Sequence, residues 1–169
     1  MKPTVNKGPW KLEVFSDSDW AGDKNNRRSV TSLMIFLEGV LIHWRSRLQK
    51  VVALSSSEAE FYACGEAVRE VPFVAQILVF LGLEVEFPVQ VKIDNVGAIF
   101  MSENKTSASR TRHMDTRWHY VNQMQDDGLV KIDFVRSEDN VSDIGTKNVT
   151  VDTMARHTPK LLTETGLLE

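Results

Sequence analysis

The chain has 169 residues, a length that fits one compact domain. Its 42% hydrophobic and 25% charged residues are typical of a globular protein. The single cysteine, Cys64, excludes an intramolecular disulfide and favours a reducing, intracellular setting. No apolar run approaches the length that spans a bilayer, and the first ten residues lack the apolar core of a signal peptide.

The formal net charge of -3 taken alone argues against a protein that binds a polyanion. Basic residues are nevertheless concentrated in the segment Ser109–Arg117, which reads SRTRHMDTR. Asn25–Arg28, Arg45, Arg47 and Lys50 add further positive charge. A locally basic face on an acidic protein can still hold a phosphate backbone, so nucleic acid remains a candidate partner.

Three strands are expected in the first third of the chain. Lys11–Ser16 alternates loosely between apolar and polar residues, and it ends at a polar, turn-rich stretch. Val30–Glu38 and Val40–Arg45 are apolar runs separated only by Gly39, which predicts an antiparallel hairpin. Trp44, within the third strand, is expected in the core of the sheet.

A long helical region is expected next. Ser55–Ser57 offers several N-cap residues, and glutamates follow in the first turn. The helix is expected to run to about Val71, where Pro72 interrupts it. A second helical stretch then continues through Leu81 and ends at Gly82.

The second half of the chain alternates strands with helices. The expected elements are a strand over Val89–Ile93, a short helix in DNVGAIFMS, a helix over Arg112–Asp126, a strand over Leu129–Val135, a short helix over Glu138–Thr146 and a last helix over Val151–Leu162. Three strands followed by alternating helices and strands predict an α/β fold, in which helices flank a mixed sheet.

Four acids occupy positions that α/β folds bring together. Asp17 ends the first strand, Glu60 lies in the first turn of the long helix, Asp94 ends the fourth strand, and Asp143 lies in the short helix after the fifth. Strand ends and adjoining helix starts converge on one crevice in such folds. Clustered carboxylates raise one another's pKa, and divalent cations with a preference for oxygen ligands relieve that repulsion. The pattern therefore suggests a metal site.

A structural reading competes with the metal site. Asp and Glu are common at helix N-caps and in turns, where they accept hydrogen bonds from free amides. Asp19, Glu58 and Asp139 also lie close to the four acids and are alternative candidates. For any single acid, spacing alone favours a cap or turn role over metal binding.

Five motifs resemble a known family. FSDSDWAGDKNNRRSVTS, VALSSSEAEFYACGEAVRE, VKIDNVGAI, SRTRHMDTRWHYV and FVRSEDNVSDIGTK resemble, in order, the ribonuclease H domain of copia-type LTR retrotransposon polyproteins. The resemblance implies the ribonuclease H-like fold, a five-stranded mixed sheet flanked by helices. It divides the chain into an N-terminal tail or connection remnant (1–10), a ribonuclease H domain (11–147) and a C-terminal helical extension (148–169).

The resemblance also implies an activity and its cofactor. Members of the family are endonucleases that cleave the RNA strand of RNA–DNA hybrids during reverse transcription, with two Mg²⁺ ions or Mn²⁺ in their place. The resemblance assigns Asp17 as a ligand of both ions. It assigns Glu60 and Asp94 to one metal site and Asp143 to the other. Asp19 is the main alternative to Asp17. The loop RSEDNVS lacks the histidine of many relatives, so a general acid–base helper stays unassigned.

Candidate substrate-binding residues lie between the fourth and fifth strands. They are Arg110, Arg112, His113, Arg117 and Asn95. Arginine contacts to phosphate supply most non-specific affinity, and hybrids are recognised through shape and ribose 2′-hydroxyls. The alternatives are an ordinary charged helix start for the basic residues and capping of the following helix for Asn95.

The expected partners are an RNA–DNA hybrid and the upstream reverse transcriptase domain of the same polyprotein, with no membrane. The expected location is intracellular, in the cytoplasm, in virus-like particles or in the nucleus. Two other functions remain open. One is a catalytically silent nucleic-acid-binding or domesticated interaction module, and the other is a strand transferase of the integrase type.

Overall fold

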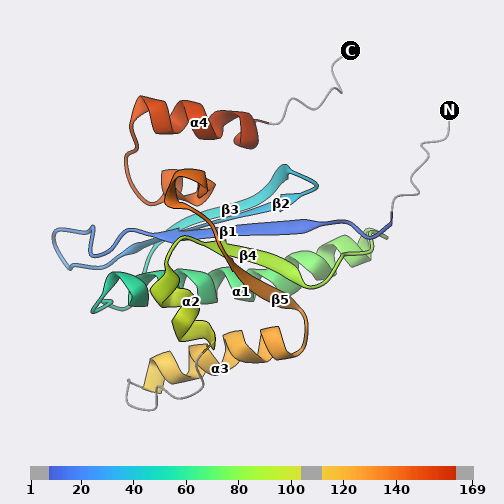
Figure 1. Cartoon of the computed structure of the whole chain (residues 1–169), viewed down its shortest axis with the longest axis horizontal. Helices are drawn as coiled ribbons and strands as arrows, with labels where there is room; N and C mark the ends of the chain where they lie inside the picture. The colour runs from blue at the N-terminus through green and yellow to red at the C-terminus, as the bar shows by residue number, and fades with distance from the viewer. Residues whose placement is uncertain (1–7, 104–111, 163–169) are drawn as a thin grey trace.

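A computed structural model describes residues 8–103 and 112–162 (Figure 1). Its centre is a five-stranded sheet with the strand order β3-β2-β1-β4-β5. The strands are β1 (Leu12–Ser18), β2 (Val30–Leu37), β3 (Val40–Leu48), β4 (Val89–Ile93) and β5 (Val130–Phe134). β1, β2 and β3 pair antiparallel, whereas β4 pairs parallel with both β1 and β5. The predicted mixed sheet is confirmed.

The β2–β3 hairpin forms as expected. Leu37 pairs with Val40, so Glu38 and Gly39 make a two-residue turn. Both have positive φ, 50° and 83°, as the hairpin turn that matches strand twist requires. The expectation for Trp44 is wrong, because its side chain is 66% exposed. Trp44 lies on β3, which is an edge strand of the sheet.

Helix α1 (Ser56–Phe80) is continuous, so the predicted interruption at Pro72 is wrong. Its start is as expected, because the Ser55 hydroxyl accepts a hydrogen bond of 3.2 Å from the backbone N–H of Glu58. A proline inside a helix costs about 3 kcal/mol relative to alanine. Buried side chains before and after it, among them Val71 and Ala75, pack on the sheet and offset that cost.

Helices cover both faces of the sheet (Figure 1). α1, α2 (Val96–Glu103) and α3 (Arg112–Asp126) lie on one side, over a large apolar core. α4 (Val151–Leu161) lies on the other side, where a smaller core forms around Phe15 and Phe36. No helix within residues 8–103 or 112–162 is both long and apolar enough to cross a membrane.

The segment after β5 differs from the single short helix expected over Glu138–Thr146. It forms two 3₁₀ turns, η1 (Ser137–Asp139) and η2 (Val141–Gly145), on either side of Asn140. Asn140 has an extended backbone and no exposed surface, and its side chain bonds to β1. That tertiary contact fixes a conformation that a continuous helix could not adopt.

Candidate metal centre

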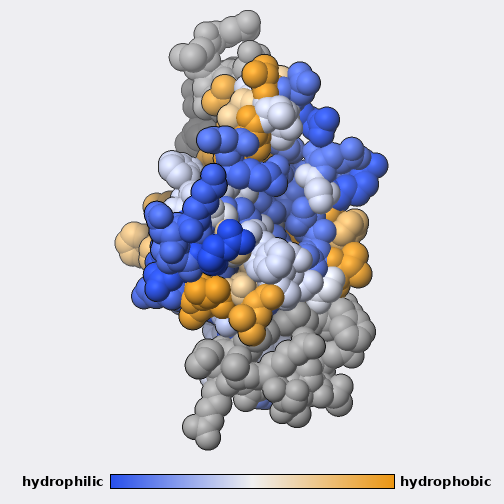
Figure 2. Space-filling model, turned by 90° about the vertical axis from the view of Figure 1, so that its left-hand side faces the viewer, coloured by the Kyte–Doolittle hydropathy of each residue, from blue (hydrophilic) through white to orange (hydrophobic). Residues whose placement is uncertain are grey.

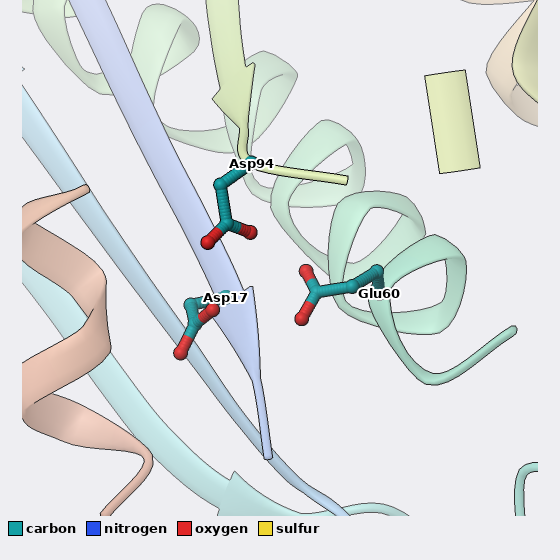
Figure 3. Close-up of side chains that lie close together, drawn as sticks. All are labelled: Asp17, Glu60 and Asp94. Atoms are coloured by element: carbon teal, nitrogen blue, oxygen red, sulfur yellow. The ribbon is translucent and has the colours of Figure 1, made fainter. Parts of the chain in front are cut away.

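Three of the four predicted acids converge at one end of the sheet (Figure 3). Asp17 lies near the end of β1, and Asp94 follows directly after β4. The two strands are parallel neighbours, so their carboxyl ends meet at the same edge. Glu60 reaches this edge from the first turns of α1. One carboxylate oxygen from each residue lies within 4.8 Å of the other two.

Two of these carboxylates are almost fully buried, Asp17 with 4% and Glu60 with 5% of its surface exposed. Glu60 Oε1 accepts hydrogen bonds from the backbone N–H of Ser18 at 2.9 Å and from its hydroxyl at 3.2 Å. Asp17 Oδ2 accepts a bond of 2.7 Å from the Thr146 hydroxyl. Glu60 Oε2 is buried and has no hydrogen-bond partner among the described residues. An unpaired buried oxygen is costly, and a bound cation would remove that cost.

Crowding of these acids changes their ionisation. Burial, together with the charges of Asp17 and Asp94, raises the pKa of Glu60 to about 9, against the hydrogen bonds from Ser18. Burial also raises the pKa of Asp17 to about 6, with a smaller contribution from Asp143. Several carboxylates crowded into one pocket repel one another when ionised. A hard divalent cation such as Mg²⁺, which prefers oxygen ligands, relieves that repulsion. The residues present therefore fit a metal site.

Asp143 lies beside this group rather than within it. Its charge raises the pKa of Asp17, so the two carboxylates interact. Its side chain is half-buried on η2 and forms an ion pair with Lys147, one turn further on. The three acids that come within 4.8 Å of one another do not include it. A role for Asp143 as a metal ligand stays a prediction.

The competing acids have other contacts. Asp19 Oδ1 accepts a short hydrogen bond from the backbone N–H of Val30 and holds the β1–β2 loop. Glu58 Oε2 accepts a bond of 2.8 Å from the N–H of Leu54 at the start of α1. Asp139 pairs with a neighbouring arginine at 2.9 Å. Asp19 and Glu58 thus have the turn and cap roles that the sequence left open, whereas Asp139 is held in an ion pair.

The end of the molecule that carries the acids is polar at its surface. Figure 2 views the end that lies on the left in Figure 1, where the β1–β2 loop, α2 and the first turn of α1 come together. Hydrophilic side chains cover most of the middle of this face, and the hydrophobic patches on it are separate. A charged ligand can therefore approach the acids without displacing a large apolar surface.

Asn95 makes the contacts of a helix-capping residue, the role predicted from the sequence as the alternative to substrate binding. Its Oδ1 accepts hydrogen bonds from the N–H of Ala98 at 3.0 Å and from the hydroxyl of Ser57 at 3.1 Å. These contacts tie the start of α2 to the start of α1. A contact with substrate stays a prediction.

Of the basic candidates, Arg117 is the one whose side chain is described. Its guanidinium lies over the ring of Tyr62, 4.5 Å from the centroid, and its Nη2 is 3.5 Å from Glu66 Oε1. Arg112 and His113 lie in the first turn of α3, but their side chains are outside the described part of the structure. Arg110 lies outside the described residues altogether.

Four residues that support the acids were not predicted. They are Ser18, Asn140, Thr146 and Lys147. Each lies within four residues of a predicted acid, inside the motifs FSDSDW and DNVSDIGTK. Polar residues that close to candidate ligands are the available sequence signal, although spacing alone does not say which of them bond.

No protein-family model matches the chain. Comparison with known proteins nevertheless identifies relatives. The chain is 38% identical over 138 residues to the retrovirus-related Pol polyprotein from transposon TNT 1-94 of Nicotiana tabacum, covering 82% of the chain and 10% of that polyprotein. It is 32% identical over 136 residues to that from transposon RE1 of Arabidopsis thaliana, covering 80% and 9%. The chain is a homologue of copia-type retrotransposon Pol polyproteins. It spans about one tenth of the length of these relatives.

Solved structures show the fold of this Pol homologue. LC11-RNase H1, isolated from compost, superposes with a TM-score of 0.59 at 15% identity, covering 80% of this chain and 92% of that one. The crystal structure of LC11-RNase H1 in complex with an RNA/DNA hybrid gives 0.56 at 14% identity, covering 80% and 94%. The Pol homologue therefore has the ribonuclease H fold that the sequence motifs implied.

Proposed function

We propose that the Pol homologue is a metal-dependent endonuclease that cleaves the RNA strand of RNA–DNA hybrids. The observation that carries this proposal is the convergence of Asp17, Glu60 and Asp94 from three separate elements. Glu60 Oε2 is buried there and has no hydrogen-bond partner in the described part of the chain. The ribonuclease H fold and the similarity to Pol polyproteins support it.

In this proposal the acids hold two Mg²⁺ ions, or Mn²⁺ in their place. Asp17, Glu60, Asp94 and Asp143 supply the ligand oxygens. When bound, such ions activate a water and stabilise the leaving oxygen of a phosphodiester. The protein's own contribution is orientation, because Ser18 fixes Glu60 through two hydrogen bonds. Thr146 fixes Asp17 through one hydrogen bond.

The proposed substrate is a hybrid recognised by shape and by ribose 2′-hydroxyls. Arg110, Arg112, His113 and Arg117 are proposed to contact phosphates, and Asn95 to contact the substrate next to Asp94. Because the chain matches only about one tenth of each polyprotein relative, we propose the upstream reverse transcriptase domain as a partner during reverse transcription. The proposed location is the cytoplasm or virus-like particles, with the nucleus as the other compartment.

A hybrid with a label on each strand tests the activity. In Mg²⁺ or Mn²⁺ the protein is expected to cut only the RNA strand. Asp94→Asn is the matched control, because Asp94 is half-buried and its side chain makes no hydrogen bond that holds the fold together within the described residues. Loss of a direct ligand is expected to reduce cleavage by more than about 100-fold, the upper end of the effect of an outer-shell change.

Two outcomes would contradict the proposal. One is the absence of cleavage at high protein concentration in both metals, with hybrid binding intact, which would favour a catalytically silent binding module. The other is selective cutting of DNA, which would favour a strand transferase. Cleavage that persists unchanged in Asp94→Asn would point to a contaminating nuclease.

A further inference from the structure

An apolar groove lies along the C-terminal half of α1, away from the acids. Its volume is about 330 Å³. Gln76 adds one amide to a lining that is otherwise apolar. The apolar lining residues are Val71, Pro72, Ala75 and Val79 on α1, Phe87 before β4 and Leu129 before β5. The groove therefore offers a site for apolar rather than charged groups.

Large apolar side chains are also exposed on the same half of α1, and Phe80 is 89% exposed. The core-facing side of this half is apolar as well, because Val71 and Ala75 are buried in the main core. A helix that is apolar on every side is normally covered on every side. The exposed residues are Phe73, Ile77, Val79, Phe80 and Leu81. We call these five residues and the groove the apolar surface.

The apolar surface lies at the opposite end of the fold from the metal centre (Figure 1). α1 and β4 each have an acid at one end, and their other ends lie beside the apolar surface. On α1, Val79 follows Glu60 by 19 residues, or about 28 Å at about 1.5 Å per residue. A partner can therefore cover the apolar surface without blocking the acids.

The charges beside the apolar surface are negative. Between Pro72 and Phe87 the charged residues are Glu84 and Glu86, and both are exposed. Asp127, in the turn before β5, is also exposed. An acidic rim repels phosphates of nucleic acid and of anionic lipid, and it attracts basic side chains. This chemistry favours a protein partner that presents apolar and basic residues.

The same charges argue against a second copy of this chain as the partner. A two-fold interface places one surface patch against the same patch of the other copy. Glu84 and Glu86 would then approach the acidic loop of the other copy, in a chain whose net charge is already -3. Like charges placed together disfavour association. A different polypeptide segment is the better occupant.

The chain enters the fold beside the apolar surface. The backbone N–H of Trp10 donates a hydrogen bond of 2.6 Å to the carbonyl of Glu84, and the N–H of Glu86 donates one of 2.9 Å to the carbonyl of Trp10. Phe87, the next residue, lines the groove. α4, the last described element, lies on the other face of the sheet from α1 (Figure 1). A segment that precedes Trp10 is therefore better placed to reach the groove than one that follows α4.

We propose that the apolar surface docks the part of a Pol polyprotein that directly precedes this chain, with apolar side chains in the groove and basic side chains at its rim. The chain matches only about one tenth of each polyprotein relative, so such a polyprotein has further sequence to supply the partner. That this part is a reverse transcriptase domain rests on the function proposed above. That the apolar surface is an interface rests on its exposed residues and on the position of Trp10.

Isothermal titration of the chain with the neighbouring segment of a relative tests the docking. The probe is the segment of the TNT 1-94 polyprotein that directly precedes the matched region, with a length of about 150 residues to include a whole domain. In EDTA and without hybrid, a Kd of about 10–100 µM is expected. Tethering within one polyprotein gives an effective concentration in the millimolar range, so this affinity suffices.

The double variant Val79→Gln with Phe80→Gln removes two exposed apolar side chains. Glutamine is a good helix former, so the melting temperature is expected to stay close to that of the parent. The affinity for the probe is expected to fall by at least about tenfold, as for the loss of central apolar contacts in an interface. Phe73→Gln with Ile77→Gln is expected to weaken binding too, which keeps the test valid if the first variant folds poorly.

The matched control is Trp44→Gln with Val151→Gln. It removes two apolar side chains that are 66% and 84% exposed and lie on β3 and α4, outside the apolar surface. Its affinity for the probe is expected to stay within about twofold of that of the parent. Hydrogen exchange of the parent should slow on addition of the probe at residues 73–87 and stay unchanged around Asp17 and Glu60.

Three results would overturn the inference. One is the absence of probe binding, or equal binding by the parent, both double variants and the control. The second is sedimentation of the parent as a dimer that Val79→Gln with Phe80→Gln dissociates and the probe does not, which would assign the surface to a second copy. The third is hybrid binding that this variant loses, which would assign the surface to nucleic acid.

Failure of this inference is distinguishable from failure of the proposed function, because probe binding is measured without metal or hybrid. A parent that binds the probe through the apolar surface but does not cleave hybrid contradicts the proposed function and supports this inference. Cleavage of hybrid by a parent that does not bind the probe does the reverse.

Discussion

The side-chain amide of Asn140 donates a hydrogen bond of 3.0 Å to the backbone carbonyl of Ser16, which lies 124 residues earlier in the chain. Neither residue has any exposed surface. Asn140 Oδ1 in turn accepts bonds from the hydroxyl and the N–H of Ser142, at 2.6 and 3.3 Å. The amide thus joins η2, which carries Asp143, to the strand that carries Asp17.

Asn140→Ala is expected to destabilise the protein by about 1–3 kcal/mol, because the Ser16 carbonyl loses its side-chain partner in a buried site. It is also expected to lower metal-dependent cleavage, because η2 loses its attachment beside Asp17. Urea unfolding measures the first effect, and the rate of hybrid cleavage measures the second. Asn26→Ala is the control, since Asn26 accepts a bond in an exposed loop. A stability equal to that of the control would contradict the role given to Asn140.

The pKa of Glu60 predicts how stability varies with pH in the absence of metal. It is about 9 in the folded protein and 4.5 in a free side chain. The folded state therefore binds this proton more tightly than the unfolded state does. The stabilisation is complete below the unfolded value and is lost as pH rises through the folded value. In EDTA the melting temperature is expected to fall between about pH 7 and about pH 9.

Glu60→Gln isolates this effect, because its side chain does not titrate. In this variant the melting temperature is expected to change less with pH across that range. The control Glu86→Gln, on an exposed loop, should behave like the parent. Asp17, with a pKa of about 6, contributes mainly at lower pH. Mg²⁺ should raise the melting temperature of the parent more at about pH 9 than at about pH 7, because ligands bind as carboxylates. A parent and a Glu60→Gln variant with parallel curves would refute this account.

The sequence predicts the fold where local rules and tertiary packing agree. The Glu38–Gly39 turn and the Ser55 cap form as expected, because each depends on residues a few positions away. Pro72 and Trp44 were mispredicted for the opposite reason. The helix continues through Pro72 because of packing on the sheet, and Trp44 is exposed because β3 lies at the edge.

The candidate site shows the same division. Asp17, Glu60 and Asp94 could be predicted because strand ends and helix starts meet by topology. Their supporting contacts could not, since Thr146 bonds to Asp17 across 129 residues of chain. The meeting of Arg45, Arg69 and Arg117 at Glu66 is harder still to predict. The three arginines come from β3, α1 and α3, and only the folded chain shows that all three share one carboxylate.

Lys147 places a positive charge beside Asp143, next to the acids of the metal centre. Burial lowers its pKa, but the hydrogen bond with Asp143 and the charges of Asp143, Asp17 and Asp94 outweigh burial and raise the pKa above its usual value. The ammonium group therefore partly neutralises the acids. A metal ion that binds Asp143 must compete with this ion pair.

Lys147→Gln is expected to act in opposite directions on stability and on metal binding. The melting temperature in EDTA should fall slightly, because the acids lose their cation. The affinity for Mg²⁺, measured by isothermal titration, should rise by about two- to fivefold, the range that corresponds to an ion pair whose lysine is 55% exposed. Lys131→Gln is the control, because it breaks an ion pair with Asp133, which is not one of the acids of the metal centre. Weaker Mg²⁺ binding in Lys147→Gln would instead mean that Lys147 positions Asp143 for the metal, and the competition argued above would be wrong.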